Sequence, residues 1–230
     1  MTTTAEPHAV RVETKSTQPL PRTVDIDRRP AFDFAKRIID VIGCLIALVL
    51  LSPVLLIAAI LVALSSSGPI FFRQRRVGAG GVEFTCLKFR TMVCDAEDLK
   101  NDLAKQSHHN DPRTFKMKRD PRITKFGYWL RRSSADELPQ LFNVLLGDMS
   151  LVGPRPPVPT EVALYTDRDM QRLSVKPGLT CIWQVSGRAD IPFDQQVAMD
   201  INYVEQRSFW LDLKLVALTL PALLTGKGAY

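Results

Sequence analysis

Two adjacent carboxylates stand beside a pair of arginines in the middle of the chain. Asp136 and Glu137 follow the run Arg131-Arg132-Ser133-Ser134-Ala135 and precede an apolar segment that starts at Leu138. Arginine binds phosphate through a planar, two-pronged donor group. A carboxylate can bind a hard cation or attack phosphorus. The combination predicts a site for a metal ion and a phosphorylated substrate.

The same residues also fit a purely structural interpretation. Ser134 followed by Glu137 is the pattern of a capping box, with a helix expected over 134–146. Capping explains Glu137 but leaves Asp136 unexplained, and the dipole of such a helix would favour the anionic, nucleophilic form of Asp136. Pro139 falls inside this turn, which would move the helix start nearer Leu138. The residues alone favour the catalytic and the capping interpretations equally.

A second candidate for phosphate binding follows in Gly153-Pro154-Arg155-Pro156-Pro157. Proline on both sides restricts the backbone and so limits where Arg155 can point. The alternative is a plain turn with a solvated arginine. Asp148 is a further acid, for which capping or solvation is an equally good explanation.

An apolar run of 27 residues, 38–64, is the expected membrane segment. As a straight helix it would be about 40 Å long, enough to cross a hydrocarbon core of about 30 Å. Ser52-Pro53 lies near its middle, and proline bends a helix because it removes a hydrogen bond and clashes with the preceding turn. The two halves, about 22 Å and about 18 Å, are each too short to span alone.

Basic residues flank both ends of this run, at positions 28, 29, 36 and 37 before it and 73, 75 and 76 after it. Such residues favour the cytoplasmic side, so a re-entrant helical hairpin is expected. A proline-kinked transmembrane helix is the alternative.

The remaining organisation predicts a mainly helical α+β protein. Residues 1–30 lack periodicity and are expected to form a disordered N-terminal arm, and 31–68 the re-entrant membrane helix. In 69–230, 70–77 and 82–89 are expected to form a small β-hairpin. Helices are expected over 96–106, 194–206 and 209–224, the last packed in the core or lying at the membrane interface. The charged segment 107–119 is expected to be a loop.

The charge of the chain points to anionic partners. A net charge of +6 suits phosphate, nucleotide or an acidic membrane surface. No nucleic-acid-binding signature occurs and the basic residues form no long block, so nucleic acid is not an expected partner. The four cysteines contain no CxxC pair, which favours reduced thiols in a cytosolic setting.

An ordered set of motifs resembles the bacterial sugar transferase family, the monotopic phosphoglycosyl transferases of glycoconjugate assembly. The matching pieces are Lys36-Arg37 with Asp40, Ser52-Pro53, Lys88-Phe89-Arg90-Thr91-Met92, Asp120-Pro121-Arg122, Asp136-Glu137-Leu138-Pro139-Gln140-Leu141, Gly153-Pro154-Arg155-Pro156, Gln184-Val185-Ser186-Gly187-Arg188 and Gly228-Ala229-Tyr230. They occur in family order and cover about five-sixths of the chain.

The resemblance implies a role for each matching residue. It implies that Asp136 is the nucleophile and that Glu137 binds Mg²⁺. Cations that match the diphosphate-binding positions are Lys88, Arg131, Arg155 and Arg188. It further implies a membrane helix broken at Ser52-Pro53, with Lys36, Arg37 and Asp40 holding that helix against the catalytic domain.

The resemblance also implies a reaction at the cytoplasmic face of the bacterial inner membrane. Sugar-1-phosphate would pass from a UDP-sugar, with galactose or glucose the leading sugars, to polyprenyl (undecaprenyl) phosphate through an aspartyl phosphosugar, releasing UMP. This would initiate exopolysaccharide or related glycan assembly, with membrane lipids and other glycan-assembly enzymes as partners. The alternatives are a glycosyltransferase that releases UDP, or a non-catalytic membrane-anchored scaffold.

Overall fold

The computed structural model describes residues 24–93, 96 and 120–225. These form a mainly helical α+β fold, as expected. The bounds of the longer helices are α1 Pro30–Ser65, α3 Lys125–Ser133, α4 Gln140–Leu146, α8 Phe193–Gln206 and α9 Phe209–Thr225. The short helical elements are η1 Ala79–Gly81, η3 Ala135–Glu137, α5 Pro159–Val162, α6 Asp167–Met170, η4 Gln171–Leu173, α7 Ile182–Ser186 and η5 Arg188–Asp190.

The expected hairpin is present. Strands β1 (Phe71–Val77) and β2 (Glu83–Phe89) pair in antiparallel fashion across the glycine-rich turn. A second, unexpected sheet pairs β3 (Ser150–Val152) with β4 (Gly178–Thr180) in parallel. The helices predicted over 194–206 and 209–224 are confirmed as α8 and α9.

Some predicted segments lie outside the described residues. These are residues 1–23 of the N-terminal arm and, apart from Ala96, the helix 96–106 and the loop 107–119. Residues 24–29 lead into α1, and the Asp27 N–H donates to the Ser174 carbonyl at 3.0 Å.

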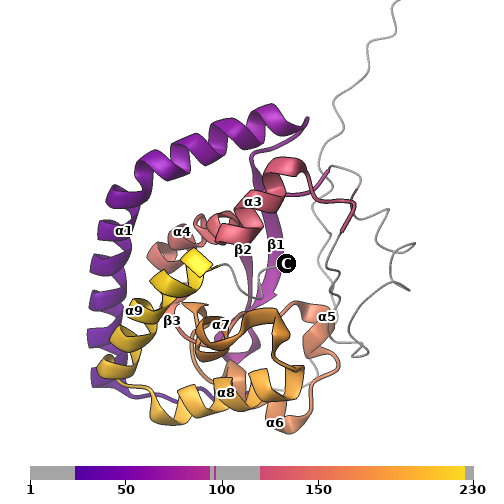
Figure 1. Ribbon diagram of the computed structural model, residues 1–230. Coiled ribbons are helices and arrows are strands. Elements are labelled where there is room, and N and C mark those ends of the chain that lie inside the picture. Colours follow the sequence, from indigo (N-terminus) through magenta and orange to yellow (C-terminus); the bar gives the residue numbers. More distant parts are fainter. Residues whose placement is uncertain (1–23, 94–95, 97–119, 226–230) are drawn as a thin grey trace, which may run out of the picture.

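Helix α1 bends around the body of the molecule (Figure 1). It is one continuous helix of 36 residues rather than two antiparallel helices. The Pro53 ring leaves the Val49 carbonyl without its usual N–H donor, and the Ser52 hydroxyl donates to that carbonyl at 2.8 Å. Ser52-Pro53 thus keeps the backbone hydrogen-bonded, as an apolar environment requires.

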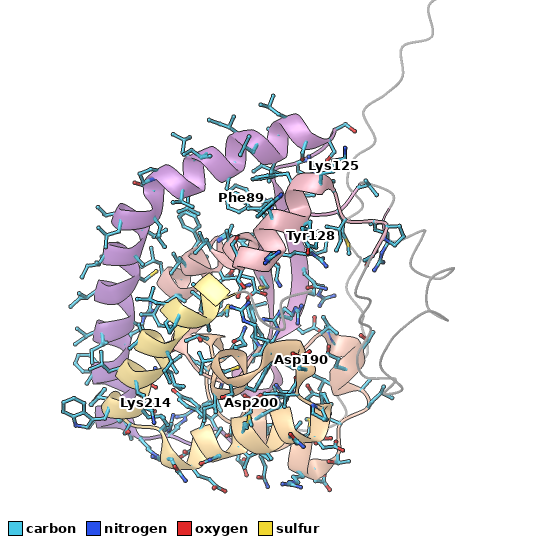
Figure 2. The ribbon with its side chains drawn as sticks, viewed as in Figure 1. Phe89, Lys125, Tyr128, Asp190, Asp200 and Lys214 are labelled. Atoms are coloured by element: carbon cyan, nitrogen blue, oxygen red, sulfur yellow. The ribbon has the colours of Figure 1, made fainter. Side chains whose placement is uncertain are left out.

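Each half of α1 packs on a different part of the same body. Cys44 in the first half packs with core residues of α4 and with Met149. Ala58 and Val62 in the second half pack with Phe89 and Leu130, and Phe89 lies beneath that half in Figure 2. The outward-facing residues stay exposed, including Val49 (73%) and Leu64 (78%). By length and composition α1 could cross a membrane, and it is the one such helix in the described part of the chain.

Asn143 fixes α4 to the hairpin. This side chain is buried, and its Oδ1 accepts from the Leu87 N–H at 3.0 Å. Its Nδ2 donates to the Thr85 carbonyl at 2.7 Å and to Asp148 Oδ2 at 3.2 Å. β2 also carries Lys88, and α4 directly follows Asp136 and Glu137. The Asn143 amide therefore helps to fix the position of Lys88 relative to these two carboxylates.

We expect Asn143→Leu to destabilise the fold, because it removes the hydrogen-bond partners of the Leu87 N–H and the Thr85 carbonyl. The expected loss is about 2–4 kcal/mol, or roughly 5–15 °C in melting temperature. Thermal unfolding of the protein in detergent measures it, with Gln195→Ala on the exposed face of α8 as control. Equal melting temperatures for the two variants would show that Asn143 does not hold the hairpin.

Candidate functional site

The two carboxylates lie in a single 3-10 turn between α3 and α4. The expected helix over 134–146 is interrupted: η3 holds Ala135–Glu137, and α4 begins only after Pro139. The prediction of a capping box formed by Ser134 and Glu137 is wrong. Ser134 has a left-handed φ of 54° and ends α3, and its side chain caps nothing. In a continuous helix the N–H of residue 139 would donate to the Ala135 carbonyl, and Pro139 has no N–H, so the helix is interrupted there.

Glu137 is shared by two cations from distant parts of the chain. Its Oε1 accepts from Lys88 Nζ at 2.7 Å and from Arg155 Nη2 at 2.8 Å. Its Oε2 receives only the longer contact from Arg155 Nη1, at 3.3 Å. Burial raises the pKa of Glu137, but the charges of Arg155 and Lys88 and their hydrogen bonds outweigh it and hold the pKa well below its usual range.

Asp136 has the opposite electrostatic character. It is buried, and burial followed by the negative charge of Glu137 raises the pKa of Asp136 to about 6. The charges of Lys88, Arg131 and Arg155 oppose this rise. The predicted helix-dipole effect was therefore wrong: Asp136 lies in a separate 3-10 turn, where desolvation dominates.

Arg131 approaches Asp136 from the last turn of α3. Its Nε donates to the Thr91 hydroxyl at 2.9 Å. Burial lowers the pKa of Arg131, and the charge of Asp136 is the largest effect that opposes it. Asp136 therefore lies near a cation, Arg131, that forms no ion pair with Glu137 among the described residues.

Backbone hydrogen bonds donated by two glycines hold the loop that carries Arg155. The Gly153 N–H donates to the Thr180 carbonyl at 3.0 Å, and the Gly178 N–H donates to the Pro154 carbonyl at 2.9 Å. A Cβ on Gly178 would lie 2.0 Å from the Gly153 nitrogen, so only glycine allows this approach. The loop is thus fastened to the β3–β4 sheet immediately before Arg155.

Arg188 reaches the same region from the chain that follows α7. Its φ is 55°, an uncommon conformation for a residue other than glycine. Burial lowers the pKa of Arg188 while the charge of Glu137 raises it. The second effect indicates that Arg188 lies within electrostatic reach of the dyad. Within the described residues its buried Nη1 has no hydrogen-bond partner, and Arg188 forms no ion pair with either carboxylate.

The predicted anchor residues lie apart from the dyad, on α1. Lys36 Nζ is 3.7 Å from Asp40, one helical turn further along α1, but its nearer partner is Asp212 at 2.6 Å. Asp40 accepts from the Leu151 N–H at 3.1 Å. Arg37 donates to the Val144 and Leu145 carbonyls, where its charge suits the C-terminus of α4.

A comparison with protein families identifies the family to which this chain belongs. The model of the family described as bacterial sugar transferase matches residues 31–226. The chain belongs to this family. The match includes every site residue described above.

Bacterial sugar transferases of known name are similar over most of this chain. The exopolysaccharide production protein ExoY of Rhizobium meliloti is 41% identical over 205 residues, which are 88% of this chain and 91% of ExoY. The galactosyl transferase CpsE of Streptococcus agalactiae is 46% identical over 196 residues, 85% of this chain but only 43% of CpsE. The UDP-glucose:undecaprenyl-phosphate glucose-1-phosphate transferase of Caulobacter vibrioides is 41% identical over 220 residues, 92% of this chain and 75% of the relative. The chain thus spans most of ExoY and less than half of CpsE.

The carboxylates could contribute to a magnesium site but could not complete one. Among the described residues, no group of three or more His, Cys, Asp or Glu side chains could hold a metal. Mg²⁺ commonly takes one or two carboxylates together with substrate phosphates and water. Glu137 Oε2, which has only one long hydrogen bond, and the adjacent Asp136 fit that donor set when a phosphate is bound.

Two residues near the site were missed at the level of sequence. Asn143 gives no pattern that marks it, because its partners are backbone groups distant in sequence. Arg76 follows Arg75 in a basic run that was interpreted only as a membrane flank. The alternation of the hairpin could have revealed it: Arg76 pairs with Phe84 while Phe72 pairs with Lys88, which puts Arg76 and Lys88 on one face.

Proposed function

We propose that this bacterial sugar transferase moves a hexose-1-phosphate, galactose or glucose phosphate, from a UDP-sugar to polyprenyl (undecaprenyl) phosphate. The observation that carries the proposal is the division between the carboxylates: Lys88 and Arg155 hold Glu137 ionised, while Asp136 has a raised pKa and no salt bridge among the described residues. The ion pairs make Glu137 a poor nucleophile, while its less occupied Oε2 could bind a metal ion. A lone carboxylate can attack.

The first step would be an attack by an Asp136 oxygen on the phosphorus that bears the sugar. A P–O bond forms, the bond from that phosphorus to the bridging oxygen breaks, and UMP leaves with the electron pair. With a pKa of about 6, the carboxylate form of Asp136 exceeds the acid about tenfold at pH 7. In the second step an oxygen of the lipid phosphate attacks the same phosphorus and releases Asp136.

The cations around the dyad would neutralise the phosphates in both steps. Lys88, Arg131, Arg155 and Arg188 bring four positive charges to two carboxylates, which leaves room for an anionic substrate. Mg²⁺, when bound by Glu137 and the diphosphate, would supply further charge neutralisation. Names of relatives support the substrates, since the Caulobacter vibrioides protein is named for UDP-glucose and undecaprenyl phosphate. The name of ExoY supports a role in exopolysaccharide production. We further propose that this step initiates glycan assembly and that other assembly enzymes are partners.

The proposed setting is the cytoplasmic face of the bacterial inner membrane, with α1 re-entrant. The two halves of α1 both contact the same body: Arg37 and Asp40 bind it near one end. Near the other, Arg90 donates to the Val62 and Ser66 carbonyls at 3.2 and 2.6 Å. A spanning helix has its ends on opposite sides of the bilayer, which one small body could not contact together. The exposed apolar outer face of α1 suits lipid.

The enzyme assay distinguishes this proposal from its alternatives. We expect UMP release from UDP-galactose or UDP-glucose with undecaprenyl phosphate and Mg²⁺. Asp136→Asn should abolish it without changing the melting temperature, since only the nucleophile is lost, and Glu137→Gln should reduce it severely. UDP as the product would indicate a glycosyltransferase. Strong UMP release by folded Asp136→Asn would contradict the aspartyl mechanism, and no nucleotide from the wild type would favour a scaffold.

The topology predicts same-side labelling at both ends of α1. Single cysteines placed at Arg28 and Ser67, in protein whose native cysteines are replaced, should react with a membrane-impermeant maleimide only in inverted vesicles. Both positions are exposed. Labelling of one position from each side of the membrane would contradict the re-entrant arrangement and support a kinked spanning helix.

A further inference from the structure

Arg76 on β1 lies next to the cation cluster, and its hydrogen-bond acceptors among the described residues are a carbonyl and an amide oxygen. Its Nη1 donates to the Pro156 carbonyl at 2.7 Å. Its Nε and Nη2 both donate to Gln74 Oε1, at 3.0 and 2.7 Å. Burial and the nearby charge of Arg155 lower the pKa of Arg76. In the described part of the chain, this half-buried guanidinium therefore has only neutral hydrogen-bond partners while a second guanidinium lies nearby, which is a costly arrangement.

The register of the hairpin turns Arg76 toward the site. Gln74 pairs with Cys86, and Phe72 with Lys88, so Gln74, Arg76 and Lys88 project from one face of the sheet. Lys88 on that face binds Glu137. The preceding Arg75 projects from the opposite face, where it forms an ion pair with Glu83.

The hydrogen bond from Arg76 falls at a critical point of the loop. Pro156 directly follows Arg155, and the next carbonyl, that of Pro157, accepts from the Val77 N–H at 2.9 Å. Two successive residues of β1 therefore hold two successive carbonyls of the loop. Together with the glycine contacts before Arg155, this fastens the loop on both sides of the arginine. Figure 1 shows β1 running from the end of α1 toward α5, which follows this loop.

We propose that Arg76, oriented by Gln74, is a positioning residue of the phosphoryl-transfer site: by holding the Pro156 carbonyl it aims the Arg155 guanidinium at Glu137 and the substrate phosphate. This inference rests on the proposed function for its substrate. It predicts that Arg76 acts through Arg155. Arg76 would then matter little once Arg155 is removed.

A double-mutant cycle tests that dependence. We expect Arg76→Gln to reduce kcat/KM for UMP release about 10- to 100-fold, since a charge-assisted hydrogen bond is lost. In the Arg155→Ala background, measured at high enzyme concentration, the same change should cost less than about 3-fold. Arg76→Lys keeps the charge and one donor and should restore part of the activity. Gln74→Ala, which frees Nε and Nη2, should give a smaller loss that also depends on Arg155.

Binding of inorganic pyrophosphate, measured by calorimetry in the same four proteins of the cycle, provides a readout that does not need turnover. The affinity should show the same non-additivity. If coupling appears in pyrophosphate binding while the wild type releases no UMP, the proposed function fails and the role of Arg76 stands.

The matched control is Arg75→Gln, which changes the same residue type one position earlier on the opposite face. It should leave kcat/KM and pyrophosphate affinity near the wild-type values. Near-wild-type kinetics of Arg76→Gln would overturn the inference. So would losses from Arg76 and Arg155 that multiply independently, because Arg76 would then act on its own. Should Arg76→Gln not fold, Arg76→Lys and Gln74→Ala carry the same cycle to the same decision.

Discussion

The carboxylate of Glu137 is the constraint on which the site depends. Glu137 is paired twice, by Lys88 from the hairpin and by Arg155 from the loop after β3, and these ion pairs offset the cost of removing its charge from water. This single side chain thereby brings together three segments that are distant in sequence. Other contacts hold the same segments in place. Asn143 joins α4, which follows the carboxylate turn, to β2, and the close approach of Gly153 and Gly178 holds the loop that carries Arg155. Removing Lys88 or Arg155 would remove the ion pair that holds its own segment, the hairpin or the loop, against Glu137.

The pairing of Glu137 also gives two neighbouring carboxylates different pKa values. Lys88 and Arg155 hold the pKa of Glu137 low, whereas Asp136 has a pKa of about 6 because burial and the charge of Glu137 act against its ionisation. Adjacent acids whose pKa values diverge in this way can divide the labour of a reaction. In the proposed reaction the division suits Glu137 as a metal ligand and Asp136 as the nucleophile. In the proposed membrane setting, the bend of α1 would place both residues at the membrane surface, where a soluble nucleotide-sugar and an embedded lipid can meet.

What the sequence predicted and what it missed follow from the range of the interactions. Local signals sufficed for the hairpin, whose strands flank a glycine turn, and for α8 and α9, which are long. Ser134 and Glu137 match the local sequence pattern of a capping box. In the structure the Glu137 side chain instead binds Lys88 and Arg155, and the helix is interrupted at Pro139. The raised pKa of Asp136 depends on burial, which no local pattern reports. Arg76 and Asn143 act on backbone carbonyls and amides far along the chain, and side-chain type carries no sign of such partners.

The central claim is that Asp136 forms the covalent bond to the phosphosugar. The most direct measurement is intact-protein mass spectrometry after incubation with UDP-galactose or UDP-glucose and Mg²⁺ in the absence of a lipid acceptor. The account predicts an added mass of one hexose phosphate, matched by one UMP released, located on the peptide that contains Asp136 and discharged when undecaprenyl phosphate is added. UMP formed only when acceptor is present, with no adduct on the protein, or an adduct on another residue, would contradict it.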